Sequence, residues 1–307
     1  MIYCSPDGEI RDVLKGKDIE FLPLKKMSLS DVKRAIDKYQ PDIIHAHDFR
    51  ASFYAAMCKK NQKLISHLHN NPPFIQNWNP KTLLYFLSTP RFDNILVVSN
   101  AVLKEAIFFN KKNKDKVTIL NNCINKDDVL ERSKDYEIEE TFDISFVGRL
   151  SEQKNPLKIL NIIKRINELK PGIKAVIVGD GEMRKECEIF IKTNGLDDVV
   201  IMKGFQKNPF PYLKNSKVSL MPSIFEGFGL VAIESMVVGT PVLNSGVGGL
   251  ATIFENDSYF ICDDIEEYAQ KAIEIIDNNK SFNLSNITER FTDMNGWKKK
   301  IINVYTK

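Results

Sequence analysis

Short apolar runs rich in β-branched residues recur along the chain, and stretches with helical spacing separate them. Turn-forming residues bound each run, as is typical of strands. The predicted strands are Asp42–Ile44, Leu64–Ser66, Asn94–Val98, Val117–Leu120, Asp143–Val147, Lys174–Val178, Val199–Met202, Val218–Met221 and Tyr259–Cys262. Repeated alternation of strand and helix predicts an α/β fold with parallel sheets covered by helices.

A polar stretch, Glu131–Glu140, interrupts this rhythm at mid-chain, lacks an apolar face and is followed at once by a new strand. We therefore expect the interdomain linker there, between an N-terminal domain of residues 1–135 and a C-terminal domain of residues 141–290. The final residues 291–307 carry apolar side chains at helical spacing, so they need a surface to cover.

Composition narrows the class of protein. The 307 residues are 43% hydrophobic and 27% charged, which excludes disordered and fibrous proteins. No run of about 18 uncharged apolar residues occurs, and charges stand where a signal peptide needs an apolar core. A cytoplasmic protein is expected. Its five cysteines are scattered without a Cys-x-x-Cys pair, so neither a disulfide framework nor a structural zinc site is predicted.

The charges are unevenly distributed. Residues 1–135 hold 22 Lys and Arg against 16 Asp and Glu, whereas residues 136–307 hold 21 against 24. Between Arg50 and Lys116, eleven basic side chains face three acidic ones. This favours an anionic membrane surface or substrate as partner, with a solvated lysine-rich face as the alternative. No nucleic-acid-binding motif accompanies it, so no nucleic-acid partner is expected.

The stretch Met221–Met236 reads as a strand, a glycine-bearing loop and a helix. Gly227 and Gly229 allow the backbone to approach a ligand closely. The helix that begins near Leu230 presents unpaired N–H groups, which suit a diphosphate.

Two glutamates flank this helix start. Glu226 precedes the helix and Glu234 lies within it, and carboxylates suit sugar hydroxyls. A surface helix with two solvated glutamates is the alternative. A second loop, Gly148–Asn155, supplies Arg149 and Lys154, cations that can neutralise a leaving diphosphate. Two ordinary surface cations are the alternative, although cations are unfavourable at a helix start unless an anion compensates them.

Val178–Arg184 contains a Gly-x-Gly turn after a strand, as dinucleotide-binding proteins do. Arg184 stands at the third glycine position and no acidic residue ends the next strand, so a dehydrogenase is disfavoured.

All four histidines fall in two His-x-His pairs, His45/His47 and His67/His69, each at the end of a predicted strand. Alternate strand residues share a face, which raises a zinc hypothesis. Zinc needs three or four converging ligands and a second shell, and no Cys or His–Glu spacing completes the set. No metal is therefore predicted, and His45 and His67 are expected to have core or strand-end roles.

Taken in order, these motifs resemble the retaining GT-B enzymes of glycosyltransferase family 4. The resemblance runs from about Ser5 to Val242, with further matches at Phe146–Asn155, Val178–Glu182 and Lys203–Phe205. It implies two doubly wound, Rossmann-like domains facing across a cleft, the donor bound by the C-terminal one. It also implies that the final helix crosses back toward the N-terminal domain.

The resemblance also assigns roles to residues. Glu226 would contact the donor sugar and Glu234 the ribose, and His69 would face the donor as an active-site residue; His47 and Asp48 are weaker candidates on the acceptor side. The nucleotide base would lie at Gly204 and Phe205, although Phe205 could equally be a core aromatic. The remaining donor-binding residues implied are Arg149, Lys154, Gly227, Phe228, Gly229 and Leu230.

The function expected from this resemblance is transfer of a hexose, with retention, from a UDP- or GDP-linked sugar to a glycan or lipid-linked acceptor. It needs no metal or other cofactor and belongs to cell-surface polysaccharide biosynthesis, with peripheral attachment to the inner face of the membrane. The alternatives are a catalytically incompetent GT-B-like binding subunit and a non-transferring GT-B enzyme such as a nucleotide-sugar epimerase.

The sequence departs from the family pattern at its front. Met1–Gly8 already resembles the family's second strand and turn, whereas the first strand of a doubly wound sheet is central. We expect the reading frame to extend upstream by a strand, a glycine-bearing loop and a helix.

Overall fold

The computed structural model describes residues 1–8, 10–109, 113–278 and 282–306. The chain forms two compact units. Unit 1 comprises Met1–Val98, Val102–Leu120 and Ile302–Lys307, and unit 2 comprises Ser99–Ala101 and Asn121–Ile301. The last helix, α14 (Met294–Thr306), begins in unit 2 and ends in unit 1, as expected of a helix that crosses back.

The chain passes from unit 1 to unit 2 earlier than predicted, and the segment expected as linker lies inside unit 2. It begins in the last turn of α6 (Lys126–Arg132) and is hydrogen-bonded to Asn208. The Asn208 amide donates to the Arg132 carbonyl at 2.7 Å and to Asp135 Oδ2 at 2.8 Å, and the Tyr136 hydroxyl donates to the Asn208 carbonyl at 2.5 Å. Hydrogen bonds that involve backbone groups hold this segment in place, so it needs no apolar face. A pattern of hydrophobic residues does not detect such bonds.

The sheet of unit 2 has five parallel strands in the order β11-β10-β7-β8-β9. They are β7 (Phe142–Val147), β8 (Ala175–Val178), β9 (Val200–Gly204), β10 (Ser216–Met221) and β11 (Val242–Asn244). The chain adds β8 and β9 on one side of β7 and then returns to place β10 on the other. This reversal defines a doubly wound sheet, which binds ligands at the carboxyl ends of the strands on either side of the switch.

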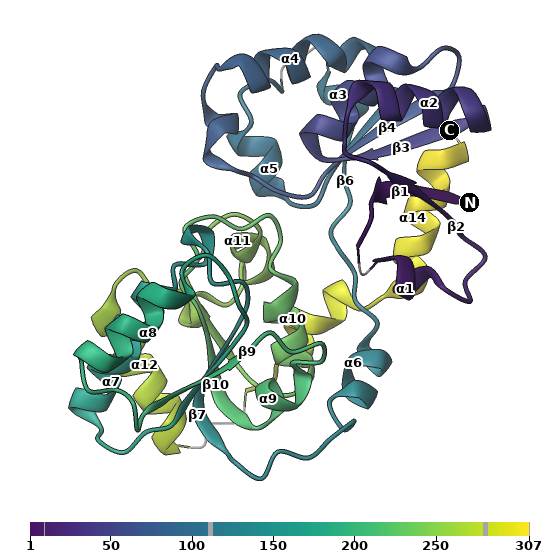
Figure 1. Ribbon diagram of the computed structural model, residues 1–307. Helices are drawn as coiled ribbons and strands as arrows, with labels where there is room; N and C mark the ends of the chain where they lie inside the picture. The colour runs from purple at the N-terminus through teal and green to yellow at the C-terminus, as the bar shows by residue number, and fades with distance from the viewer. Residues whose placement is uncertain (9, 110–112, 279–281, 307) are drawn as a thin grey trace. The chain divides into compact units, whose positions relative to one another are not determined.

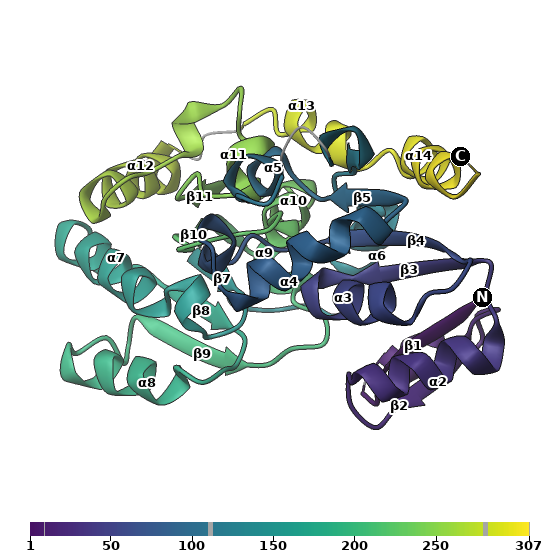
Figure 2. The ribbon, with the colours of Figure 1, turned by 90° about the horizontal axis from the view of Figure 1, so that it is seen from above.

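Helices cover both faces of this sheet (Figures 1 and 2). On one face α7 (Pro156–Leu169) packs against α8 (Arg184–Thr193) and α12 (Ile265–Asn278). On the other face α10 (Leu230–Val237) packs against α9 (Phe210–Lys214), α6 and α13 (Ser285–Thr288). A short helix, α11 (Gly249–Ile253), follows β11. Because both faces are covered, β8 is buried along its whole length.

Unit 1 contains a four-stranded parallel sheet in the order β3-β4-β5-β6 and a separate parallel pair, β1 and β2. The strands are β1 (Ile2–Pro6), β2 (Glu20–Leu24), β3 (Ile43–His47), β4 (Lys63–Leu68), β5 (Asn94–Val97) and β6 (Val117–Ile119). The helices are α1 (Ile10–Leu14), α2 (Leu29–Tyr39), α3 (Asp48–Cys58), α4 (Pro80–Ser88) and α5 (Asn100–Glu105). Of these, α3 packs on β3 and β4, with α2 and α4 against it.

Within the described ranges, β1 pairs only with β2 and β3 only with β4. The predicted strand upstream of Met1 stays a prediction. The sequence pattern did not predict β2, because Pro23 lies within it; proline cannot donate to a ladder and is accommodated in a strand at the edge of a sheet, which is where β2 lies.

Eight of the nine predicted strands coincide with strands of the structure, whereas the last one, Tyr259–Cys262, is wrong. Ser258–Phe260 forms a 3₁₀ turn, and Ile261 makes one isolated bridge to Asn244. The apolar run has another cause: Phe260 is buried against the ring of Phe254, at a centroid distance of 5.7 Å.

The turn after β8 presses on the loop after β7, and this contact shapes the carboxyl end of the sheet. A Cβ added to Gly179, whose φ is +145°, would lie 1.9 Å from the Gly148 carbonyl oxygen. At Gly181 it would lie 2.4 Å from the Leu150 carbonyl oxygen. Only glycine allows these two loops to lie against each other.

We expect Gly179→Ala to lower the free energy of unfolding by about 3 kcal/mol, because the methyl group forces the two loops apart. The control is Gly172→Ala, whose φ is also positive (+87°) but whose added Cβ meets no atom within 4 Å. Backbone strain alone should cost about 1 kcal/mol there. Urea unfolding measures both, and equal losses would show that the loops do not constrain each other.

Candidate functional site

Two loops meet at the switch point of unit 2. Residues 148–155 follow β7, and residues 222–229 follow β10. The Ile224 N–H donates to the Gln153 carbonyl at 2.8 Å, and the Gln153 amide donates to the Phe225 carbonyl at 3.1 Å. These bonds join both loops into one rim at the carboxyl ends of β7 and β10, where the sequence placed its two main motifs.

An ion pair lies in this rim. The Lys154 ammonium donates to Glu226 Oε2, and the Ser223 hydroxyl donates to the same oxygen at 3.4 Å. Glu226 is only 8% exposed. Because isolated charges are costly to bury, each side chain holds the other in place, and the two predicted residues are in direct contact.

Arg149 lies on the same loop but is exposed. Its guanidinium pairs with Glu182 at 3.3 Å, and both side chains are more than half exposed. Exposed pairs of this kind contribute at most about 1 kcal/mol. Exchanging Glu182 for an anionic ligand therefore costs little, and Arg149 can turn toward a phosphate.

The helix α10 begins in this rim. Gly229 precedes it with φ +98°, and a Cβ there would lie 2.7 Å from a methyl group of Leu250. Leu230 is the first helical residue and is 39% exposed. The ring of Phe228 is buried and meets Phe291 at 5.4 Å, so Phe228 offers a ligand its backbone only. The helix α10 has eight residues and follows a glycine, so the free N–H groups of its first turn can bind an anion.

Glu234 lies one turn further along α10 and is partly buried. Burial raises its pKa to about 7, and the nearby guanidinium of Arg132 on α6 opposes this shift only in part. The carboxyl is therefore half-protonated near neutral pH. Sequence reasoning proposed Glu234 for hydrogen bonding; its raised pKa follows from burial in the folded structure and could not be predicted.

Gly204 ends β9, and Phe205 follows it. Gly204 has φ +67°, and Phe205 is 65% exposed, so the alternative of a core aromatic is wrong. Arg184 lies beside Gly204 and is held between Asp180 and Glu188, at 2.9 and 2.8 Å. A bulky, ion-paired side chain at the third glycine position agrees with the argument against a dinucleotide-binding turn.

In unit 1 strand pairing unites the two histidine pairs. The register places His47 opposite His67, and alternation turns all four imidazoles to one face. His45 Nε2 lies 3.1 Å from His67 Nδ1, and His47 Nδ1 lies 2.7 Å from His69 Nε2. Burial lowers the pKa of all four, that of His45 to about 3. The imidazoles are neutral at physiological pH.

Asp48 has a structural role beside this cluster. It adopts φ +64° at the start of α3, and its Oδ1 accepts a hydrogen bond from the His69 N–H at 3.0 Å. Asp48 thus fixes the backbone at the end of β4, where His69 is half-buried. The predicted residues His47, Asp48 and His69 are in mutual contact.

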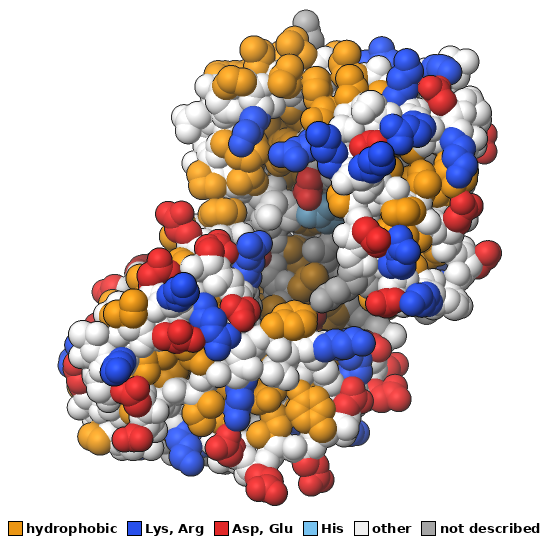
Figure 3. Space-filling view, in the orientation of Figure 1, with side chains coloured by type: hydrophobic (Ala, Val, Ile, Leu, Met, Phe, Trp, Pro, Cys, Tyr) orange, Lys and Arg blue, Asp and Glu red, His pale blue; other side chains and the backbone are white. Residues whose placement is uncertain are grey.

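The helix α4 exposes leucines and buries polar side chains. Leu83, Leu84 and Leu87 are 48%, 45% and 63% exposed, whereas Thr82 and Ser88 are buried. Trp78, just before the helix, is 58% exposed. Figure 3 shows hydrophobic side chains gathered with Lys and Arg side chains over the part of unit 1 where Figure 1 places α4. We call Trp78, Leu83, Leu84 and Leu87 the α4 patch.

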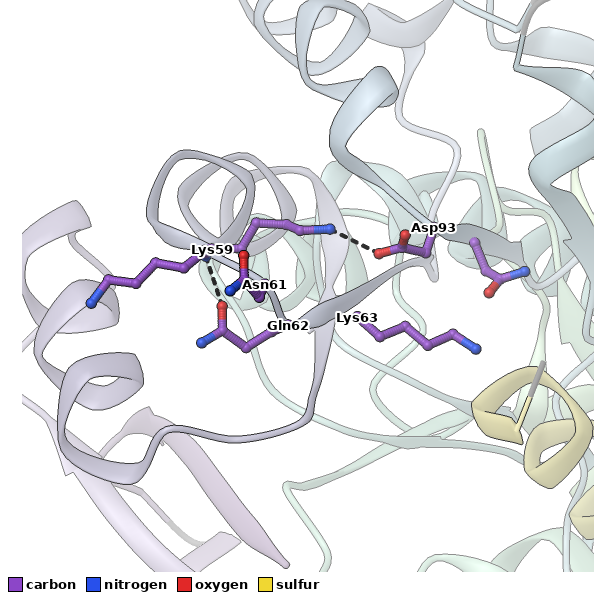
Figure 4. A pocket seen from close by; sticks show the side chains of 7 residues that line it. Lys59, Asn61, Gln62, Lys63 and Asp93 are labelled. Carbon is purple, nitrogen blue, oxygen red and sulfur yellow. Dashed lines mark hydrogen bonds and ion pairs between the residues drawn. The ribbon is translucent and has the colours of Figure 1, made fainter.

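A cavity lies elsewhere in unit 1, at the amino end of β4 (Figure 4). It measures about 500 Å³ and is polar. Its cations are already bonded: Lys59 pairs with Asp93 at 2.8 Å, and Lys63 donates to the Val304 carbonyl at 2.7 Å. Parallel sheets bind ligands at the opposite, carboxyl end. This cavity is therefore not the candidate site.

These contacts also qualify the predicted basic region between Arg50 and Lys116. Lys59, Lys60 and Lys63 are bonded to groups of the same unit, and Lys116 donates to the Phe92 carbonyl at 2.8 Å. Residues 110–112 lie outside the described residues. Part of the charge excess thus serves the fold rather than an anionic surface.

Comparisons with known proteins agree with this architecture. The family model described as Glycosyl transferases group 1 matches residues 128–290, and that described as Glycosyltransferase Family 4 matches residues 10–128. The structure of HepE from Anabaena in complex with UDP and glucose superposes with a TM-score of 0.83 at 19% identity, covering all of this chain and 91% of that one.

Two curated relatives are similar in sequence. An uncharacterized glycosyltransferase of Methanocaldococcus jannaschii is 27% identical over 255 residues, or 75% of this chain and 62% of the relative. The N-acetylgalactosamine-N,N'-diacetylbacillosaminyl-diphospho-undecaprenol 4-alpha-N-acetylgalactosaminyltransferase of Campylobacter jejuni is 29% identical over 197 residues, or 64% of this chain and 52% of the relative. The chain thus spans between half and about three fifths of the length of these relatives.

One of the two family models covers more than half of the chain. The chain therefore belongs to the group 1 glycosyl transferases of family 4 and has the GT-B fold, as the motifs predicted.

The raised pKa of Glu234 has a measurable effect on stability. The folded state prefers the protonated carboxyl, so the stability this group contributes is lost as the pH rises from 4.5, the ordinary pKa, through 7. Glu234→Gln stays neutral. We expect it to stabilise the protein by about 1 kcal/mol at pH 5 and about 3 kcal/mol at pH 8.

Urea unfolding of both proteins at the two pH values measures this difference. Glu186→Gln on the exposed side of α8 is the matched control, because it removes the same charge at a solvent-exposed position. A gain for Glu234→Gln that is the same at pH 5 and pH 8 would mean that the carboxyl titrates in the ordinary range.

Proposed function

We propose that the protein is a retaining glycosyltransferase that moves a hexose from a UDP- or GDP-linked donor to a glycan or lipid-linked acceptor. The observation that carries this proposal is the ion pair between Lys154 and the buried Glu226 beside the start of α10, at the switch point of unit 2. It joins a cation for phosphate, a carboxylate for sugar hydroxyls and a helix N-terminus in one rim.

In this proposal the donor diphosphate lies at the start of α10. Arg149 and Lys154 neutralise the negative charge that grows as the sugar–phosphate bond breaks. When the phosphate engages Lys154, Glu226 exchanges its ammonium partner for sugar hydroxyls. The sugar passes through an oxocarbenium-like transition state, as in glycoside hydrolysis, and the neutral imidazole of His69 hydrogen-bonds to it.

The nucleoside occupies the remaining predicted contacts. Glu234 accepts hydrogen bonds from the ribose, and the base stacks on the exposed ring of Phe205 beside Gly204. The backbone of Gly227, Phe228, Gly229 and Leu230 lines the diphosphate. The transfer uses no metal or other cofactor, because the charge of the leaving group is met by Arg149, Lys154 and the helix start.

The names of relatives support the substrate class. The Campylobacter relative is named for transfer to a diphospho-undecaprenol-linked sugar, and HepE was solved with UDP and glucose. We propose a lipid-linked or glycan acceptor and a place in cell-surface polysaccharide biosynthesis, at the cytoplasmic face of the membrane.

Transfer of radiolabel from a panel of nucleotide sugars to membrane extract, in the presence of a chelator, tests this function. Label in lipid or polymer supports a metal-independent transferase. Label that returns only as an altered nucleotide sugar would identify an epimerase, and tight donor binding without transfer would identify a catalytically incompetent binding subunit.

The two glutamates should differ in their kinetic effects. Glu226 contacts the sugar as charge develops, so Glu226→Ala should lower kcat and kcat/KM together. Glu234 holds ribose hydroxyls that do not change, so Glu234→Ala should mainly raise the donor KM. At about 1.5–3 kcal/mol per hydrogen bond to a charged group, each effect is on the order of tenfold to a hundredfold.

Steady-state kinetics measures both variants, with folding checked by circular dichroism. Glu186→Ala is the control and should match the wild type, since Glu186 is exposed on α8. Near-wild-type kinetics for all three variants would contradict the assignment.

We also propose that unit 1 attaches to the membrane through the α4 patch. Among the described residues, no helix combines the length and apolar character needed to cross a bilayer. The patch instead suits the interface: tryptophan favours the headgroup region, leucines enter the acyl boundary, and Lys81 on the same helix suits anionic lipids.

Replacing Leu83 and Leu87 by Asp should lower the fraction of protein that floats with anionic liposomes. Burying one leucine contributes about 1.5–3 kcal/mol, so the partition coefficient should fall by more than about tenfold. Ile189→Asp on α8 is the control, because Ile189 is 66% exposed, like Leu87, but lies in unit 2. Equal flotation of all variants, or flotation independent of anionic lipid, would rule out this surface.

A further inference from the structure

The four histidines meet more closely than their positions in the sequence indicate. One nitrogen from each of His45, His47 and His67 lies within 4.8 Å of the others. The sequence argument against zinc depended on the lack of a third converging ligand, and the register of β3 with β4 supplies that ligand. Imidazole nitrogens are the ligands that Zn²⁺ and its neighbours in the first transition row prefer.

Only one assignment of nitrogens lets all three rings bind the same ion. His45 Nδ1 is bonded to the Tyr305 hydroxyl, so His45 can offer only Nε2, which lies beside His67 Nδ1. The ligand atom of His67 is therefore Nδ1. The His67 ring is 3% exposed, and its Nε2 has no hydrogen-bond partner among the described residues.

The distance between the histidine nitrogens and the hydrogen bond from Tyr305 also fit a bound metal ion. Two nitrogens bound to one tetrahedral Zn²⁺ at about 2.0–2.1 Å lie roughly 3.3 Å apart, and His45 Nε2 and His67 Nδ1 are 3.1 Å apart. The remaining nitrogen of His45 lies 2.7 Å from the hydroxyl of Tyr305. A hydrogen bond of this kind orients a ligating histidine.

We propose that His45, His47 and His67 bind one divalent transition-metal ion, of the class of Zn²⁺ or Co²⁺, with Tyr305 as the positioning residue for His45. This site goes beyond the proposed function. It lies within unit 1, whereas the phosphate and ribose contacts are assigned to unit 2, and its ligand His47 lies 2.7 Å from the active-site candidate His69.

Protein without a polyhistidine tag tests the proposal well, because all four histidines of the chain belong to this cluster. After dialysis against a chelator, Co²⁺ alone is titrated while visible absorption is recorded. We expect one ion per chain and the intense visible bands of low-coordinate Co²⁺, and Zn²⁺ should displace it. Absence of stoichiometric binding, or the weak spectrum of a six-coordinate surface ion, would overturn the proposal.

Three variants localise the site. His47 is exposed, so His47→Gln should fold normally and lose more than about a hundredfold in Co²⁺ affinity. Tyr305→Phe keeps the ring but not the hydroxyl, and it should lose about tenfold to a hundredfold. Leu87→Gln on α4 is the control and should bind like the wild type. Circular dichroism verifies folding of each.

Cysteine is the competing ligand. Alkylating the three cysteines that are at least partly exposed, Cys4, Cys58 and Cys123, should leave Co²⁺ affinity unchanged. Binding that survives in His47→Gln, or that disappears on alkylation, would place the ion elsewhere and contradict the proposal. These readouts do not involve sugar transfer, so they are decided independently of whether the protein is a transferase.

Discussion

The ion pair between Lys154 and the buried Glu226 is the interaction on which the candidate site depends. Taking an ammonium and a carboxylate out of water costs several kcal/mol, and their attraction repays this only if the geometry is fixed. The backbone bond from Ile224 to Gln153 supplies that geometry by joining the two loops. The loop after β7 in turn lies against the turn after β8, where glycine alone fits. The ion pair therefore depends on the contact between the loops, and that contact depends on the sheet topology and on the glycines.

Much of this arrangement could be predicted from the sequence. Strand–helix alternation identified two α/β units, and the motifs at Gly148–Asn155 and Met221–Met236 follow strands that are neighbours across the switch point. Carboxyl ends of parallel strands share one edge of a sheet, so Lys154 and Glu226 had to be near each other. Their direct contact is the simplest outcome of that rule.

The remaining features depend on information that a linear pattern lacks. The linker was placed too late because Asn208, some 70 positions away, binds the polar segment through backbone groups. Phe228 was predicted to bind the donor, and the structure leaves only its backbone for that role, because the ring lies in the core against Phe291. The histidines appeared as two separate pairs because only the register of β3 with β4 makes them one cluster. Tertiary pairing decides each case, and neither periodicity nor motif spacing encodes it.

The discontinuity of unit 1 has a consequence for biosynthesis. His45 and Tyr305 are separated by 260 positions, and the Lys63 ammonium is bonded to the carbonyl of Val304. During translation β3 and β4 leave the ribosome long before α14 does. At about 5–20 residues per second, the interval between Leu120 and Ile302 lasts roughly 10–40 seconds. For that period the face of β3 and β4 that carries the histidines lacks its contact with α14. A chaperone has time to bind this face before α14 is synthesised.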